Sequence, residues 1–266
     1  MKKKERKKYL IRRVVALFIL VFIIIGIIVI GSKLLLQPKK TETEKRQIEP
    51  ITLSFESRIS NIESLNAHEM AKVGWIQVQG TNIDYPVMVP GFDDFNTENI
   101  NYVWRTPNYT SGEFRETILG HNIVNVSSHP LTDNNNLVDF EPLMSFVYYD
   151  VARDNMYIQY TKDGKDDLYV IYAIGFYDYI ETDGRSFETK EEVKKHIEEV
   201  KKNSIYNYNL DVDENDELLT LITCTRFFGL NEKQQFVIDA RLVREEETPV
   251  KYVVEKNQNY DIMNLD

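Results

Sequence analysis

The chain between residues 51 and 243 consists mainly of short runs in which apolar and polar positions alternate at the period of a β-strand. β-Branched and aromatic side chains fill these runs, and turn-forming residues separate them. The predicted strands are 116–120, 157–160, 168–179, 217–225 and 235–243, after a β-hairpin over 74–89. Several strands with hairpin-type connections predict a mostly antiparallel β-barrel.

Other stretches of this region change to the spacing of a helix. The clearest is 189–202, in which Val193, Ile197 and Val200 form an apolar stripe between Glu and Lys residues. This pattern is typical of an amphipathic helix. The other predicted segments are one or two short helices in 53–72, a short helix or turn in 138–144 and a surface connection in 92–110.

Residues 14–31 form an uninterrupted apolar run without a charged group. At a rise of about 1.5 Å per residue, this run and its extension to residue 36 span a bilayer core of roughly 30 Å, so we predict a transmembrane anchor over 14–36. The arm at 1–13 has a net charge of +7, which leaves −17 on the rest of the chain. The positive-inside rule then places the arm in the cytoplasm. A cleaved signal peptide is the alternative, but no small-x-small cleavage site follows the apolar run.

Composition divides the remainder into a linker, a domain and a tail. Residues 37–50 are polar and charged, residues 51–244 are long enough for one domain with a sizeable core, and residues 245–266 form an acidic tail. The tail is either disordered or packed on the barrel. The acidic balance argues against nucleic acid and anionic lipid as partners. Residues 211–217 resemble a calcium loop without its glycine and final glutamate, which predicts an acidic turn, with a weak calcium site as the alternative.

The only cysteine of the chain, Cys224, lies at the end of the strand predicted at 217–225. Both faces of that strand are largely apolar, so it is predicted to be central, with a loop after it. Two interpretations fit the cysteine: a buried structural residue, or a nucleophile that the strand holds in place while the loop admits a substrate. A lone thiol outside the cell has no internal disulfide partner, which favours the nucleophile.

His121 and Asn122 directly follow the strand predicted at 116–120. A histidine at this place is either a solvated loop residue or a functional one. The other histidines are weaker candidates: His196 lies on a predicted solvated helix face, His68 in the early helical region and His129 in a loop before a proline.

Three motifs occur in order: G-W-I-Q-V-Q-G-T-N-I-D-Y-P-V at 74–87, G-H-N at 120–122 and T-L-I-T-C at 220–224. Together they resemble the sortases, the membrane-anchored cysteine transpeptidases of Gram-positive cell walls, over roughly residues 53–243. The early helices and the helix before the cysteine strand are similar to the class B branch. The resemblance implies an eight-stranded sortase-type β-barrel with N-terminal helices, in agreement with the strand pattern.

The resemblance also implies roles for residues of the matched motifs. Cys224 would attack a carbonyl carbon in a C-terminal sorting signal and form a thioacyl intermediate. His121 would protonate the leaving amine and deprotonate the incoming one. Thr223, Asn122 and Gln235 are implied to bind the substrate, and no cofactor or metal ion is implied.

One position departs from the family pattern. Sortases have an arginine at the start of the last strand, where it holds the substrate and the developing oxyanion, whereas this chain has Gln235. Arg226, two residues after the cysteine, is predicted to reach across the site in its place, with a surface arginine as the alternative. Arg241 is predicted to lie about 20 Å from Gln235, since a strand rises about 3.3 Å per residue.

The function implied by the resemblance is a single-pass membrane transpeptidase whose catalytic domain lies outside the cell. Its implied partners are secreted proteins with a C-terminal sorting motif and, as the amine acceptor, a peptidoglycan precursor or a pilin lysine. Cell-wall anchoring and pilin polymerisation both fit. Two alternatives stay open: a pilus assembly factor whose catalysis is impaired by loss of the arginine, and a cysteine protease in which water resolves the thioacyl enzyme.

Overall fold

The computed structural model describes residues 50–64, 71–89, 103–105, 114–120, 122, 139–178, 187–225, 227 and 234–260. Contacts divide the chain into two compact units, Met1–Ile48 and Glu49–Asp266, and every described residue belongs to the second. The predicted arm, membrane anchor and nearly all of the linker therefore lie outside the described residues. Within the part that is described, no helix is long and apolar enough to span a membrane.

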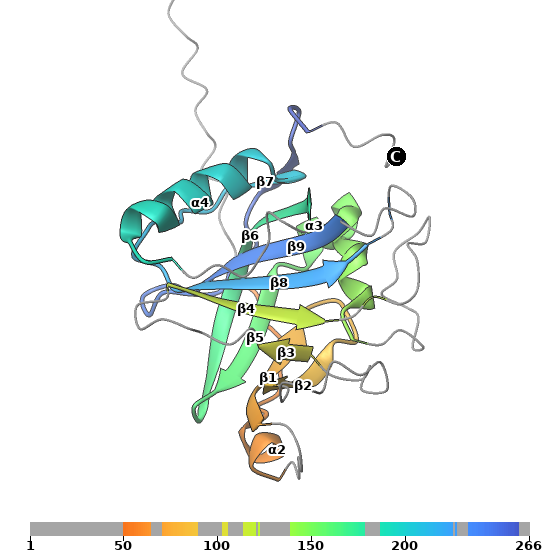
Figure 1. Ribbon diagram of the computed structural model, residues 1–266, viewed down its shortest axis with the longest axis vertical. Coiled ribbons are helices and arrows are strands. Elements are labelled where there is room, and N and C mark those ends of the chain that lie inside the picture. Colours follow the sequence, from red (N-terminus) through yellow and green to blue (C-terminus); the bar gives the residue numbers. More distant parts are fainter. Residues whose placement is uncertain are drawn as a thin grey trace, which may run out of the picture. The chain divides into compact units, whose positions relative to one another are not determined.

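Eight of the described strands curl into a closed barrel (Figure 1). In chain order they are β1 (Ala71–Val78), β2 (Asp84–Val89), β3 (Val103–Arg105), β4 (Arg115–Gly120), β5 (Tyr157–Lys162), β6 (Lys165–Asp178), β8 (Leu218–Cys224) and β9 (Gln234–Leu242). They pair in the order β1-β2-β3-β4-β8-β9-β6-β5, and β5 pairs with β1. The β2–β3 and β4–β8 pairs are parallel and the other pairs are antiparallel. The predicted mostly antiparallel β architecture is confirmed.

The described helices are short. They are α2 (Ile59–Ser64), the 3₁₀ helix η1 (Glu141–Val147), α3 (Tyr149–Asp154) and α4 (Lys190–Lys202). α4 confirms the predicted amphipathic helix, because its buried residues are Val193, Ile197 and Val200. A capping box begins it: Thr189 Oγ1 accepts from the Glu192 N–H, and the Glu192 carboxylate accepts from the Thr189 N–H.

β5 and β6 form a β-hairpin, because the two-residue turn Asp163-Gly164 joins them directly. Both turn residues have positive φ, 49° and 73°, and the flanking Lys162 and Lys165 are paired. Asp-Gly is typical of such a tight turn, since glycine adopts positive φ without strain. β6 therefore begins three residues before the predicted strand at 168–179, and the Asp-Gly dipeptide is the sequence signal for its true start.

β3 corrects the prediction of a surface connection over 92–110. It has only three residues and is held between β2, to which it is parallel, and β4, to which it is antiparallel. So short a strand has no readable alternation of its own, and its neighbours decide its conformation. The helix α3 was likewise not predicted.

The C-terminal segment packs on the domain as far as it is described. β10 (Val254–Lys256) pairs with β7 (Tyr206–Tyr208), and neither strand was predicted. The Tyr157 hydroxyl donates to the Val250 carbonyl at 2.7 Å, and Asn257 Nδ2 donates to the Ser204 carbonyl at 2.7 Å. Residues 250–257 are thus joined to β5 and to the segment after α4.

His196 does not lie on a fully solvated helix face, contrary to the prediction. Its side chain is only 17% exposed, and its ring lies 4.9 Å from that of Phe187. Its Nε2 lies 3.5 Å from Oδ1 of the buried Asp239 on β9, which also accepts a 2.7 Å hydrogen bond from Thr220 on β8. The histidine is therefore part of the contact between α4 and strand β9 of the barrel.

Candidate active site at the end of the cysteine strand

Cys224 is the last residue of β8 and the only exposed one. The six residues before it in the strand are buried, and β8 pairs with both β4 and β9. The predicted central strand is confirmed, and the interpretation of Cys224 as a buried structural cysteine is wrong. Burial ends where the strand ends, so a rigid backbone presents the thiol to the surface.

β4 ends beside Cys224. In the parallel β4–β8 register, Gly120 pairs with Thr223, whose buried hydroxyl donates to the Gly120 carbonyl at 2.9 Å. A Cβ at Gly120 would lie 2.5 Å from Cγ of Phe140, so this close approach requires glycine. Thr223 therefore ties the two strand ends together, although its sequence-based role was substrate binding.

His121 and Arg226 lie outside the described residues, so their catalytic roles stay predictions. What the structure adds is the position of the residues around them. Gly120, which precedes His121, is one register position from Cys224. The ends of β4 and β8, which are far apart in the sequence, therefore lie next to each other.

Asn122 contacts the cysteine backbone. Its Nδ2 donates to the Cys224 carbonyl at 2.9 Å, which adds a side-chain tie between the segment after β4 and the end of β8. Its Oδ1 is buried and has no hydrogen-bond partner among the residues that the structure describes. Asn122 therefore contacts the backbone of Cys224, and its predicted role in substrate binding stays a prediction.

Gln235 lies directly opposite Cys224 in the antiparallel β8–β9 register. Residues that face each other in such a pair project to the same side of the sheet, with Cβ atoms about 5 Å apart. The Gln235 side chain is buried, at 5% exposure, and its Oε1 has no hydrogen-bond partner within the described part of the chain. The position at which sortases have an arginine therefore adjoins the cysteine, but holds an uncharged amide.

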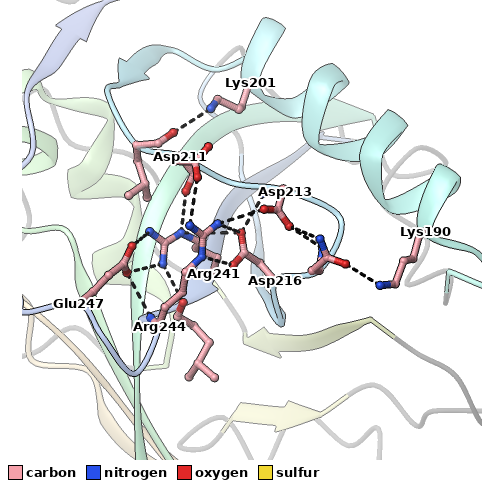
Figure 2. Close-up of polar contacts among 11 residues, drawn as sticks. Lys190, Lys201, Asp211, Asp213, Asp216, Arg241, Arg244 and Glu247 are labelled. Carbon is pink, nitrogen blue, oxygen red and sulfur yellow. Dashed lines mark hydrogen bonds and ion pairs between the residues drawn. The ribbon is translucent and has the colours of Figure 1, made fainter.

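Arg241 lies at the opposite end of β9, as predicted, where it pairs in register with Leu218. It is fully buried, and its Nη1 and Nη2 each donate to Glu247 at 2.8 Å while its Nε donates to the Asp211 carbonyl at 2.8 Å (Figure 2). These contacts give Arg241 a structural role away from the cysteine.

The predicted acidic turn before β8 is confirmed, and its carboxylates bind an arginine of the same chain. Arg244 donates to carboxylates of Asp211, Asp213 and Asp216, at 3.0, 3.4 and 2.8 Å (Figure 2). Among the described residues, no group of three acidic, histidine or cysteine side chains is arranged to hold a metal ion.

Comparison with known proteins shows a similarity to sortases of class B. No family model matches the chain. Sortase B of Staphylococcus aureus (strain NCTC 8325 / PS 47) is 24% identical over 243 residues, which cover 84% of this chain and 95% of that protein. The crystal structure of Clostridium perfringens sortase B matches with a TM-score of 0.55 at 22% identity, over 70% of this chain and 98% of its own. In sequence and in fold the chain is similar to class B sortases, which supports a class B-like member of the sortase family.

A further structure with this sortase fold is a Staphylococcus aureus sortase B–substrate complex. It matches with a TM-score of 0.54 at 17% identity, over 71% of this chain and 86% of that one. The sequence resemblance to class B sortases, first noted from three motifs, is thus confirmed over most of the chain. It supports a transpeptidase function in general.

Asp139 is a buried residue of this site region that sequence reasoning missed. It precedes Phe140, whose ring packs against Gly120 at the end of β4. Both of its carboxylate oxygens are buried, and neither has a hydrogen-bond partner in the described ranges. Burial, and secondly the nearby Glu141, raise the pKa of Asp139 to about 8. Its φ of 49° lies in the left-handed region that Asp tolerates, but a single Asp before a predicted helix gave no signal for this environment.

Proposed function

We propose that the chain is a membrane-anchored cysteine transpeptidase. The observation that carries the proposal is the exposed Cys224 at the end of the buried central strand β8, one register position from the end of the strand that leads into His121. The sequence similarity to sortase B over most of the chain, and the substrate complex known for one of these relatives, support the same chemistry.

The proposed reaction has two steps. The thiolate of Cys224 attacks the carbonyl carbon of a peptide bond in a sorting signal, the C–N bond breaks, and His121 gives a proton to the leaving amine. An incoming primary amine then attacks the thioacyl carbonyl carbon and the C–S bond breaks. The proton lost by the amine passes to His121, and the thiolate returns to Cys224.

The described residues keep the nucleophile in one position. The Thr223–Gly120 hydrogen bond joins β8 to β4, and the Asn122 amide holds the carbonyl of Cys224 itself. Both contacts act on backbone carbonyls rather than on the thiol. A preorganised nucleophile of this kind reacts without first having to fix its own orientation.

The proposal extends to location and partners. The apolar run at 14–36 anchors the enzyme, the basic arm stays in the cytoplasm, and the catalytic domain acts outside on secreted proteins with a C-terminal sorting motif. The acceptor is a primary amine of a peptidoglycan precursor or of a pilin lysine. Arg226 takes the role of the arginine that is absent at position 235.

The test is single-turnover reaction of the full chain in detergent with a panel of fluorogenic sorting peptides, followed by mass spectrometry of the protein. We expect a thioacyl adduct on Cys224 in the wild type, none in Cys224→Ala, and slower adduct formation in His121→Ala and Arg226→Ala. Arg153→Ala is the matched control, because Arg153 is an arginine of α3 that binds Asp150 and Asp154. No adduct in the wild type, together with an adduct in Gln235→Arg, would instead support a pilus assembly factor that has lost turnover.

A further inference from the structure

Two buried amide oxygens flank the nucleophile from the two strands that adjoin β8. Asn122 Oδ1 belongs to the segment after β4, and Gln235 Oε1 to the start of β9. Neither has a hydrogen-bond partner in the portion of the chain that is described. Buried polar atoms are nearly always hydrogen-bonded, and those that are not commonly mark functional positions. Two such atoms beside one exposed cysteine indicate a ligand that brings its own donors.

The chemistry of the two atoms restricts that ligand. Carbonyl oxygens of amides accept hydrogen bonds and do not donate them, so they serve neither an oxyanion nor a substrate carbonyl. A neutral primary amine fits a pair of acceptors, since it has two N–H donors on one nitrogen and a lone pair that remains for attack. A peptide N–H offers only one donor.

The charge at position 235 favours the same ligand. A primary amine with an ordinary pKa of about 10.4 arrives at the site as a cation. Gln235, which lies opposite the cysteine in the strand register, is uncharged, so it adds no positive charge that would oppose the approach of an ammonium group. Outside the basic arm the chain has a net charge of −17, which also attracts an ammonium group.

We infer that Asn122 and Gln235 form the binding site of the incoming amine and thereby favour transfer over hydrolysis. The inference rests on the proposed function, since it concerns the second step of that reaction. The arriving ammonium group first loses one proton to solvent, which frees its lone pair. With the two remaining N–H groups held by Asn122 Oδ1 and Gln235 Oε1, the neutral amine nitrogen attacks the thioacyl carbon. An amide bond forms, the C–S bond breaks with its electron pair returning to sulfur, and the amine proton passes to the base.

The experiment measures how the thioacyl enzyme partitions between amine and water. The full chain is acylated with a fluorogenic sorting peptide and given increasing concentrations of triglycine or Nα-acetyl-lysine amide. The ratio of amide product to hydrolysed product is followed by mass spectrometry. In Gln235→Met, which keeps the length of the side chain but removes the acceptor, we expect the ratio at limiting amine to fall about tenfold or more, through a raised KM for the amine.

Two further variants at position 235 are expected to affect the ratio of amide to hydrolysed product differently. Gln235→Glu keeps an acceptor and adds a negative charge, so we expect the ratio to stay at the wild-type value or rise. Gln235→Arg removes the acceptor and adds a positive charge, so we expect a ratio at least as low as in Gln235→Met. Gln159→Met is the matched control, because Gln159 is a glutamine of β5 whose amide donates to the Glu56 carbonyl at 2.8 Å.

The outcomes separate this inference from the proposed function. Normal thioacyl formation with an unchanged product ratio in Gln235→Met overturns the amine site alone. A slower acylation with an unchanged ratio also overturns it, because the amide then serves the sorting peptide. If the wild type forms no thioacyl adduct with any peptide, the proposed transpeptidase function fails and the amine site fails with it.

Discussion

The two ends of the β8–β9 pair each contain a buried polar residue of β9, but they differ in how the polar atoms of that residue are satisfied. At the Leu218 end, the buried Arg241 donates to Glu247 and to the Asp211 and Leu242 carbonyls. At the Cys224 end, the buried Gln235 has an oxygen for which the described residues provide no partner. Six residues, about 20 Å of strand, separate Arg241 from Gln235.

The difference shows how one strand pair divides stability and function. At the Arg241 end, here named the closed end, a network of charged hydrogen bonds holds the acidic turn and the segment after β9 on the barrel. At the Cys224 end, here named the open end, acceptors without a partner among the described residues lie beside an exposed thiol. They weaken the isolated fold and leave donors to be supplied by a substrate. Asp139 belongs to the open end as well, since Phe140 packs against Gly120.

The largest expected effect concerns Arg241. Arg241→Met leaves the Glu247 carboxylate without its buried partner, so we expect the free energy of unfolding to fall by about 3–5 kcal/mol, measured by urea denaturation. Gln235→Met, at the open end, is expected to change it by less than about 1 kcal/mol. The double variant Arg241→Met/Glu247→Leu is the control and is expected to recover part of the loss. Equal effects of Arg241→Met and Gln235→Met would contradict the comparison.

The second prediction concerns Asp139 and its raised pKa of about 8. Because the folded state binds this proton more tightly than the unfolded state, stability is lost as the pH rises from about 4, the unfolded pKa, to about 8. Asp139→Asn removes the titration and suits the left-handed φ of 49°. We expect the variant to be more stable than the wild type by roughly 1–3 kcal/mol at pH 9, and the gain to vanish near pH 4, measured by unfolding at each pH. A gain that does not depend on pH would show that Asp139 is ionised in the folded state.

The third prediction sharpens the description of the closed end. Arg244→Met removes the partner of three carboxylates, of which that of Asp216 is buried. We expect a loss of about 1–2 kcal/mol at pH 7, measured by thermal unfolding. The pKa of Asp213 is lowered, first by the Asn215 backbone N–H and then by other contacts including Arg244. A group with a lowered pKa contributes stability above pH 4 that is lost as the pH falls, so the gap between variant and wild type should narrow in acid. A constant gap down to pH 2 would argue against the ion pairs as its source.

The smallest expected effect on stability is at the open end. Thr223→Val keeps the shape of the side chain but removes the hydrogen bond to the Gly120 carbonyl, so we expect a loss of about 0.5–1.5 kcal/mol. Because the bond joins the ends of β4 and β8, thioacylation should slow by more than this loss of folded protein explains. Thr161→Val is the control, since its hydroxyl donates to Asp166 in the β5–β6 hairpin. Identical relative rates in the two variants would show that Thr223 has no role in positioning the cysteine.

The sequence alone determined the features that depend on local pattern. The stripe of Val193, Ile197 and Val200 and the Thr189 cap specify α4, because residues three and four apart share one face of a helix. Alternation and apolar content likewise indicated the central strand that ends at Cys224, and the motifs around it indicated the family.

The tertiary structure decided what depends on contacts between residues far apart in the chain. The three-residue strands β3, β7 and β10 exist only through their partners, and the contact of His196 with Asp239 joins α4 to β9. Asn122 and Gln235 are separated by more than a hundred residues, yet both adjoin Cys224 because β4 and β9 pair with opposite edges of β8. Strand pairing of this kind is set by the packing of the whole barrel, and no local spacing of apolar residues encodes it.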